Sequence, residues 1–152
     1  MKWSIQAADP SDATDISKLT KVSKAFWGYS DEQMSEWDEV LTISQEYIEE
    51  NIVFKLIVDL DLVAYYSMIH VDEKHIKLDN LFVHPEHMKN GLGSLLLGEA
   101  ISLAQELGYQ VMILDADPNS KSFYDLHGFV EVDQKESSIE GRYLPVMGIR
   151  LG

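Results

Sequence analysis

The residues best suited to chemistry lie between Leu78 and Leu97, in the sequence LDNLFVHPEHMKNGLGSLLL. A strand-like run ends at Val83, a short polar loop follows, and Asn90-Gly-Leu-Gly-Ser94 opens a strongly helical segment. Glycines at such a junction leave backbone N–H groups uncovered, and the helix dipole adds partial positive charge behind them. The stretch therefore predicts an anion site suited to a pyrophosphate.

Two other phosphate-binding motifs do not fit this stretch. A P-loop NTPase requires Gly-Lys-Ser/Thr at a fixed spacing after its first glycine, and the chain lacks it. The dinucleotide fingerprint requires a third glycine where Leu96 stands, and it opens a βαβ unit, whereas the strand before Gly91 belongs to a meander. The loop therefore favours another class of pyrophosphate-binding protein.

A second signature follows the helix, in the run Asn119-Ser-Lys-Ser-Phe-Tyr-Asp-Leu-His-Gly-Phe129. Together and in this order, the two signatures resemble those of the GNAT superfamily of acyl-CoA-dependent N-acyltransferases. In the first motif of that family, an Arg or Gln is followed three residues later by Gly, and two residues after that by Gly or Ala. Gly91 and Gly93 match this pattern, whereas Met88 stands where the family has Arg or Gln.

The resemblance implies acetyl-CoA as the cofactor. Its pyrophosphate would be bound by backbone N–H groups of the loop and the helix start, and Lys89 either neutralises a phosphate or is an ordinary exposed lysine. The strand before the loop would splay from its neighbour and pair through its backbone with the pantetheine arm. Asn119 would lie near the cofactor. The implied cofactor-binding residues are Leu81, Phe82, Val83, Met88, Lys89, Asn90, Gly91, Leu92, Gly93, Ser94, Asn119 and Tyr124.

The resemblance also places Tyr124 near the cofactor's sulfur. Acetyl transfer to an amine needs a neutral nucleophile, a polarised carbonyl and a proton for the leaving thiolate. A tyrosine with a pKa of about 10 stays protonated at neutral pH and can donate to a thiolate whose conjugate acid has a pKa of about 8.5. Tyr124 is therefore the candidate general acid. The alternative is a packed aromatic ring whose hydroxyl has a routine partner.

The general base has a weaker signal. Asp79 and Asn80 are adjacent on the strand before the loop, so their side chains point to opposite faces. Asp79 is the candidate that takes the ammonium proton through water, and the alternative is a solvent-facing carboxylate. His84, Glu86 and His87 suggest a metal, but no third or fourth ligand is evident, so we expect solvated histidines and no metal site.

Two runs are candidates for the acceptor site, SKAFWGYS at 23–30 and IEGRYLPVM at 139–147. Both resemble a bacterial GNAT subset of unassigned substrate. Trp27 and Tyr29 flank Gly28 between two expected helices, where this fold places the acceptor. Arg142 is a candidate clamp for a substrate carboxylate. The alternatives are core aromatics and a loop arginine paired with an acidic residue.

Periodicity and turn residues predict the elements around these motifs. Strands are expected at Trp3–Ala7, Ile52–Asp59, Leu62–Val71, His75–Val83, Val111–Leu114, Phe129–Val132 and Leu144–Arg150. Helices are expected after Asp9 with an apolar stripe of Ile16, Leu19, Val22 and Phe26, after Ser30 with Gln33 as a capping box, after Thr42 with Gln45 as a third short helix, over Leu92–Leu107, and from Asn119 or Ser120 to Gly128.

The order β-αα-βββ-α-β-α-ββ predicts an α/β (α+β) fold. It is a mixed, mostly antiparallel twisted sheet flanked by helices, in which the two strands around the long helix are parallel. The same order is that of the GNAT fold, so the resemblance covers nearly the whole chain. We expect one GNAT-like acetyltransferase domain over residues 1–152.

Composition excludes several classes of protein. The net charge is −14, from 26 acidic and 12 basic residues without a basic cluster, which argues against nucleic-acid binding. The acidity either attracts a cationic amine or serves solubility. There is no Cys, no apolar run long enough to span a membrane and no signal-peptide pattern, so we expect a cytoplasmic protein that binds no membrane.

The sequence therefore predicts an N-acetyltransferase that transfers acetyl from acetyl-CoA to a primary amine of a small molecule or a peptide. Without Cys for an acyl-enzyme, the amine would attack directly in a ternary complex. The alternative is a non-catalytic acyl-CoA-binding sensor or interaction module with the same fold. A third reading, a nucleotide-binding protein, requires tight binding of ATP or NAD. The resemblance is also compatible with a homodimer.

Overall fold

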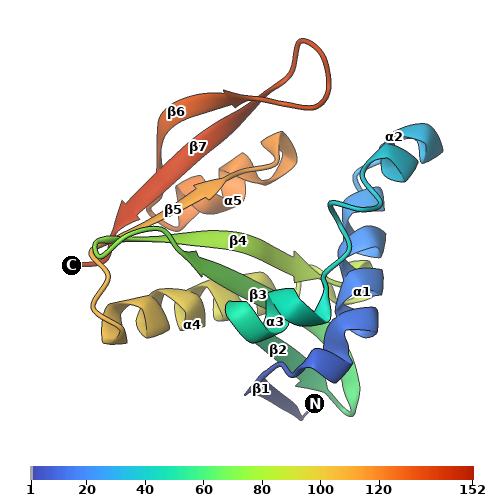
Figure 1. Cartoon of the computed structure of the whole chain (residues 1–152), viewed down its shortest axis with the longest axis horizontal. Helices are drawn as coiled ribbons and strands as arrows, with labels where there is room; N and C mark the ends of the chain where they lie inside the picture. Colours follow the sequence, from blue (N-terminus) through green and yellow to red (C-terminus); the bar gives the residue numbers. More distant parts are fainter. Residues whose placement is uncertain (1) are drawn as a thin grey trace. The chain divides into compact units, whose positions relative to one another are not determined.

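The computed structural model describes residues 2–152, and their contacts divide the chain into two compact units. The first unit comprises the residues up to Met68 together with Asn80–Leu97. The second comprises Ile69–Asp79 and Gly98–Gly152. Two strands and the longest helix contain residues of both units. Figure 1 colours the chain by residue number and labels its helices and strands.

The first unit holds the N-terminal elements. These are β1 (Trp3–Ala7), the 3₁₀ turn η1 (Pro10–Asp12), α1 (Ala13–Ala25), α2 (Asp31–Glu36), α3 (Gln45–Glu50), β2 (Ile52–Val58), most of β3 (Asp61–His70), the end of β4 (His75–Val83), η2 (Pro85–His87) and the start of α4 (Leu92–Glu106). The second unit holds the remaining residues of β3, β4 and α4. It also holds β5 (Val111–Asp115), η3 (Pro118–Ser120), α5 (Lys121–Leu126), β6 (Val130–Glu136) and β7 (Tyr143–Arg150).

The strands form a seven-stranded sheet in the order β1-β2-β3-β4-β5-β7-β6. The pairs β1–β2, β2–β3, β5–β7 and β6–β7 are antiparallel, and β4 pairs with β5 in parallel. Only a crossover connection can join parallel neighbours, and α4 provides it. The predicted α/β fold, with a mixed and mostly antiparallel sheet flanked by helices, is confirmed.

Serine hydroxyls begin the two short helices between β1 and β2. Ser30 Oγ accepts a hydrogen bond from the backbone N–H of Gln33 at 3.1 Å, which is the Ser30 half of the predicted capping box. The third short helix is also present, but its predicted cap is wrong. Ser44 Oγ accepts from the N–H of Tyr47 at 3.0 Å, whereas Thr42 donates its hydroxyl to the Asp38 carbonyl and closes the preceding turn.

Helix α1 buries a more polar face than its apolar stripe predicts. Of the apolar stripe, Ile16 and Leu19 are buried, whereas Val22 and Phe26 are 46% and 55% exposed. Hydroxyl residues of α1 are buried instead because each has a partner on another segment of the first unit. Ser17 Oγ bonds the backbone of Ile43, and the Thr20 hydroxyl lies 2.6 Å from that of Tyr65. Hydrogen bonding removes the usual penalty for burying such groups.

Each unit has its own buried apolar residues. In the first unit, α1, α3 and one face of the sheet share a cluster made of Ala13, Ile16, Leu19, Ile43, Ile48, Val53 and Tyr65, with Phe82 at its margin. In the second unit the buried side chains include Ile76, Leu78, Met112, Leu114, Phe129 and Met147. These clusters hold rigid the strand ends and loops that carry the motifs.

Candidate active site

The loop between β4 and α4 follows a tight turn. Pro85 begins η2, and the N–H of Met88 donates to the Pro85 carbonyl at 3.3 Å. This bond engages one of the amides expected at the pyrophosphate. Lys89 and Gly91 then take positive φ values of 68° and 77°. The left-handed backbone reverses the chain at Gly91 and starts α4 at Leu92.

The start of α4 directs its first-turn amides toward the loop. The Gly91 carbonyl accepts the first helical hydrogen bond, from the N–H of Leu95 at 3.0 Å. Leu92 is buried and fixes the helix, whereas Lys89, Asn90 and Ser94 are exposed. Helix geometry directs the N–H groups of the first turn outward from the helix end, where the dipole favours an anion. Gly91 thus takes the left-handed conformation that the turn into α4 requires, and phosphate binding by this loop stays a prediction.

Strands β4 and β5 pair in parallel through His75–Lys77 and Val111–Ile113. On its other edge, β5 pairs with β7 from Val111 to Asp115. The splay of the strand before the loop stays a prediction. In the first unit, the end of β4 is held by the Val83 carbonyl, which accepts from Ser23 Oγ at 3.0 Å.

Asp79 and Asn80 are neighbours on β4. The side chain of Asn80 donates to Ser67 Oγ at 2.9 Å and lies 3.5 Å from the Tyr47 hydroxyl. Because neighbouring residues of a strand face opposite ways, Asp79 belongs to the other face, which it shares with Lys77. The two residues are thus separated as the strand pattern predicts.

A second carboxylate, Asp115, ends β5 and binds two lysines. Its Oδ2 lies 3.2 Å from Lys77 Nζ and 3.3 Å from Lys135 Nζ. Burial alone raises the pKa of Asp115, but the hydrogen bonds and charges of the two lysines outweigh this effect and hold the pKa below its ordinary value. Asp115 is therefore an ionised partner of the lysines and a poor proton acceptor.

The second signature forms η3 and α5 in the second unit. Tyr124 is only 8% exposed, and its ring contacts Phe123 and Phe129 edge-on, with centroids 5.1 and 5.5 Å away. Its carbonyl accepts from the N–H groups of His127 and Phe129, which close the helix end around Gly128. Asn119 is exposed at the start of the same segment. The motif therefore buries its tyrosine and exposes its asparagine.

Asp117 orients Asn119, and the sequence analysis missed this residue. Its Oδ1 accepts from the backbone N–H of Asn119 at 2.8 Å and from Asn119 Nδ2 at 2.9 Å. Its Oδ2 lies 3.8 Å from Arg142 Nη2. The signal was available in part, because Asp followed by Pro118 is a helix-start pattern. The ion pair with Arg142 has no local signature.

The sequence profile of the acetyltransferase (GNAT) domain matches residues 28–147, which include both signatures. The chain belongs to the GNAT acetyltransferase family. YafP of Escherichia coli K12, an uncharacterized N-acetyltransferase, is 30% identical to it over 116 residues, which are 76% of this chain and 71% of the relative.

Solved GNAT structures share the fold. PaiA N-acetyltransferase from Thermoplasma acidophilum, crystallised with coenzyme A, superposes with a TM-score of 0.83 over 99% of both chains at 19% identity. YncA of Salmonella typhimurium, crystallised with acetyl-CoA, has a TM-score of 0.73 at 20% identity and covers 100% of this chain and 95% of its own. The resemblance stated from the two signatures is thereby confirmed.

The aromatic residues expected at the acceptor of this GNAT protein have two different environments. Trp27 is 40% exposed and contacts Phe26 edge-on. Tyr29 packs edge-on against Trp37, with centroids 4.8 Å apart, and Lys24 Nζ lies over both rings. Trp27 thus offers an open surface, whereas Tyr29 stabilises the turn between α1 and α2.

Among residues 2–152, no group of three or more His, Cys, Asp or Glu side chains is arranged to hold a metal ion. His84 and His87 contact each other edge-on, and His84 Nδ1 accepts the backbone N–H of Glu86. The histidines thus shape η2 of the GNAT loop. No helix within residues 2–152 is long and apolar enough to cross a membrane.

Burial of Tyr124 has a measurable effect on stability. It raises the pKa of the phenol well above its ordinary value of about 10, because the charged form loses solvation. The neutral phenol makes its full contribution to the free energy of unfolding below pH 10. This contribution is lost as the pH rises toward the folded-state pKa. We therefore expect the free energy of unfolding to fall above pH 10, by about 1.4 kcal/mol per pH unit for this one group.

Urea unfolding of the wild type and of Tyr124→Phe between about pH 9 and 11 measures this contribution, since the variant lacks the titrating group. The difference between the two proteins in free energy of unfolding should change with pH. Parallel curves would contradict the burial of a protonated phenol.

Proposed function

We propose that this GNAT protein is an N-acetyltransferase that moves an acetyl group from acetyl-CoA to a primary amine by direct attack in a ternary complex. The observation that carries the proposal is Tyr124, a phenol in the second family signature that is 8% exposed, packs against Phe123 and Phe129, and is protonated at neutral pH. A protein that only bound acyl-CoA would not need a proton donor there. We further propose that residues 1–152 act as one acetyltransferase domain.

Acetyl-CoA supplies the activated acetyl group in this proposal. PaiA and YncA, which share the fold, were crystallised with CoA and acetyl-CoA. We assign the pyrophosphate to the amides of Asn90–Ser94 and the charge of Lys89, and the pantetheine arm to the backbone of Leu81–Val83 and to Asn119. The donor set fits an anion, since it combines a helix start with one cation. Met88 forms part of the turn. Its N–H donates to the Pro85 carbonyl, so it is not assigned to the pyrophosphate.

The reaction forms an amide C–N bond and breaks the thioester C–S bond. The Tyr124 hydroxyl donates a hydrogen bond to the leaving sulfur, which departs as a thiolate and takes its proton from solvent, and Asp79 accepts the proton of the amine through water. A phenol with a raised pKa favours hydrogen-bond donation over complete transfer, so its main effect is to stabilise the charge that develops on sulfur.

The acceptor in this proposal is the primary amine of a small molecule or a peptide. Trp27 and Tyr29 line its side of the site, and Arg142 is available to a substrate carboxylate in competition with Asp117. The charge of −14 favours the approach of a cationic amine. We also propose a cytoplasmic homodimer.

The alternative function is an acyl-CoA sensor, and Met88 favours it because the family has Arg or Gln there. Calorimetric titration with acetyl-CoA, CoA and ATP, followed by an assay of thiol release with a library of amines, separates the two. Binding of both CoA species but not ATP, with amine-dependent thiol release, supports the transferase. Binding without release with any amine supports the sensor, and no CoA binding rejects both.

A further inference from the structure

Strand β1 is an unprotected edge of the sheet. It stands at one end of the strand order and pairs with β2 through the register Trp3–Val58 to Ala7–Phe54. Trp3, Ser4, Gln6 and Ala7 are all exposed, and Trp3 is 48% exposed. An open hollow of about 820 Å³ runs beside the strand, lined by residues that include Trp3, Ser4 and Leu60.

The two edges of the sheet differ in charge. The last strand at the other end, β6, carries Glu131, Asp133, Lys135 and Glu136 and a bulge between Glu131 and Asp133. Charges and bulges prevent edge strands from pairing with other chains. Strand β1 has the sequence WSIQA, without a charge or a proline, in a protein of net charge −14. Because the strand carries no charge, pairing of two copies through it brings no like charges of the strand together.

The hydrogen bonds of β1 identify the groups that it offers. Asp59 donates its N–H to the Lys2 carbonyl and Ala8 donates to that of Val53, so these positions are bonded pairs of the β1–β2 ladder. Bonded pairs alternate along an antiparallel ladder. Ser4 and Gln6 therefore direct their backbone toward β2. Trp3, Ile5 and Ala7 direct their N–H and C=O groups away from the sheet.

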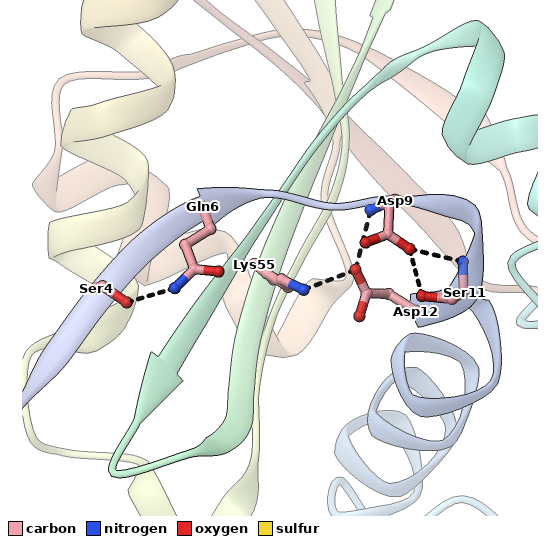
Figure 2. A network of polar contacts seen from close by, with 6 residues as sticks. All are labelled: Ser4, Gln6, Asp9, Ser11, Asp12 and Lys55. Carbon is pink, nitrogen blue, oxygen red and sulfur yellow. Dashed lines mark hydrogen bonds and ion pairs between the residues drawn. The ribbon is translucent and has the colours of Figure 1, made fainter.

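Polar contacts hold this edge in an extended conformation. As Figure 2 shows, Gln6 Nε2 donates to Ser4 Oγ at 2.9 Å, and Lys55 Nζ on β2 reaches Asp12 Oδ2 at 2.8 Å. Asp12 in turn accepts from the N–H of Asp9, which caps η1. The end of β1 is thus tied both to β2 and to the turn before α1. A preorganised strand loses less conformational entropy when it pairs.

We propose that β1 pairs antiparallel with β1 of a second copy of this chain, about a two-fold axis at Ile5. Among the two-fold alignments that set outward groups opposite each other, this one pairs all three outward residues. Ile5 then faces Ile5 of the second copy, and Trp3 faces its Ala7. Three bonded pairs with two hydrogen bonds each join the strands.

Side chains and charges fit the same alignment. The large, exposed Trp3 lies beside the small Ala7 of the second copy, and Ser4 lies beside its Gln6. Apolar side chains are thus paired with apolar ones, and polar with polar. Lys2 precedes the strand and Asp9 follows it. A two-fold antiparallel arrangement brings Lys2 of one copy toward Asp9 of the other. The charges at the ends of the neutral strand are therefore complementary.

Ala7→Pro tests the pairing without removing a bond of the β1–β2 ladder, because the N–H of Ala7 points outward. Sedimentation analysis of the full chain should show a dimer for the wild type and for the control Ala7→Ser, which keeps this N–H. The dissociation constant of Ala7→Pro should be at least about 10-fold higher, since each dimer loses two hydrogen bonds and gains two ring clashes. A monomeric wild type, or a dimer that Ala7→Pro leaves unchanged, would overturn the proposal.

Single cysteines test the register, and the chain has none of its own. Opposed residues of a bonded antiparallel pair have Cα atoms about 5.5 Å apart, within the range that a disulfide spans. Ile5→Cys should therefore form a covalent dimer on mild oxidation. Ala7→Cys should not, because the two cysteines would be offset by about 13 Å along the strands. Equal cross-linking of both variants would reject the two-fold at Ile5. Neither readout depends on acetyl transfer.

Discussion

Replacement of Tyr124 with phenylalanine is expected to lower kcat for acetyl transfer by about 100-fold, the lower limit of what a positioned general acid contributes. The ring packs between Phe123 and Phe129, and phenylalanine preserves that packing, so the fold should be retained. The lost group is the hydroxyl that stabilises the leaving thiolate. A fall in kcat with an unchanged KM for acetyl-CoA would locate the effect in the transition state.

Tyr109→Phe is the matched control, because it removes the same atom from a tyrosine between α4 and β5, outside the proposed site, where the hydroxyl lies 2.7 Å from His70 Nδ1. Steady-state kinetics of both variants with one amine, and their thermal unfolding, complete the comparison. The assignment of Tyr124 fails if the two variants have the same kcat. It also fails if Tyr124→Phe loses activity only in proportion to a loss of folded protein.

Replacement of Gly91 with alanine is expected to weaken acetyl-CoA binding by about 10-fold. The added methyl group meets no atom within 4 Å, so the effect does not come from a clash. It comes from φ of +77°, where a residue with a Cβ is disfavoured by about 1–2 kcal/mol. Relaxation of this strain rotates the loop and turns the first amides of α4 away from the pyrophosphate. Calorimetric titration with CoA measures the change.

Gly141 provides a control with the same geometry. It has a φ of +76°, its added methyl also meets nothing within 4 Å, and it lies in the loop between β6 and β7. Gly141→Ala should lose a similar free energy of unfolding and bind CoA as the wild type does. If the two alanine variants bind CoA equally well, the loop before α4 is not the pyrophosphate site.

Local patterns predicted most of the fold. The bounds of β4 at His75 and Val83 were predicted correctly, because turns on both sides limit a run of β-branched and aliphatic residues. The start of α4 after Gly91 and the cap at Ser30 were also correct. Such features depend on contacts between residues a few positions apart, and the sequence displays these directly.

Features that depend on distant partners were predicted less well. Asp117 has no visible role until its contacts with Asn119 and Arg142 are known. The apolar stripe of α1 did not indicate that Thr20 and Ser23 are buried, because their partners, Tyr65 and the Val83 carbonyl, are distant in sequence. A hydroxyl can be buried or exposed, and only its partner decides which.

By itself, the sequence determined the family, the order of the elements and the glycine loop before α4, since motif spacing and periodicity are properties of neighbouring residues. The tertiary structure decided that Tyr124 is buried, that the ionised Asp115 pairs with two lysines, and which strand forms an open edge of the sheet. Burial, ion pairing and strand order arise from residues brought together by folding. No local pattern encodes them.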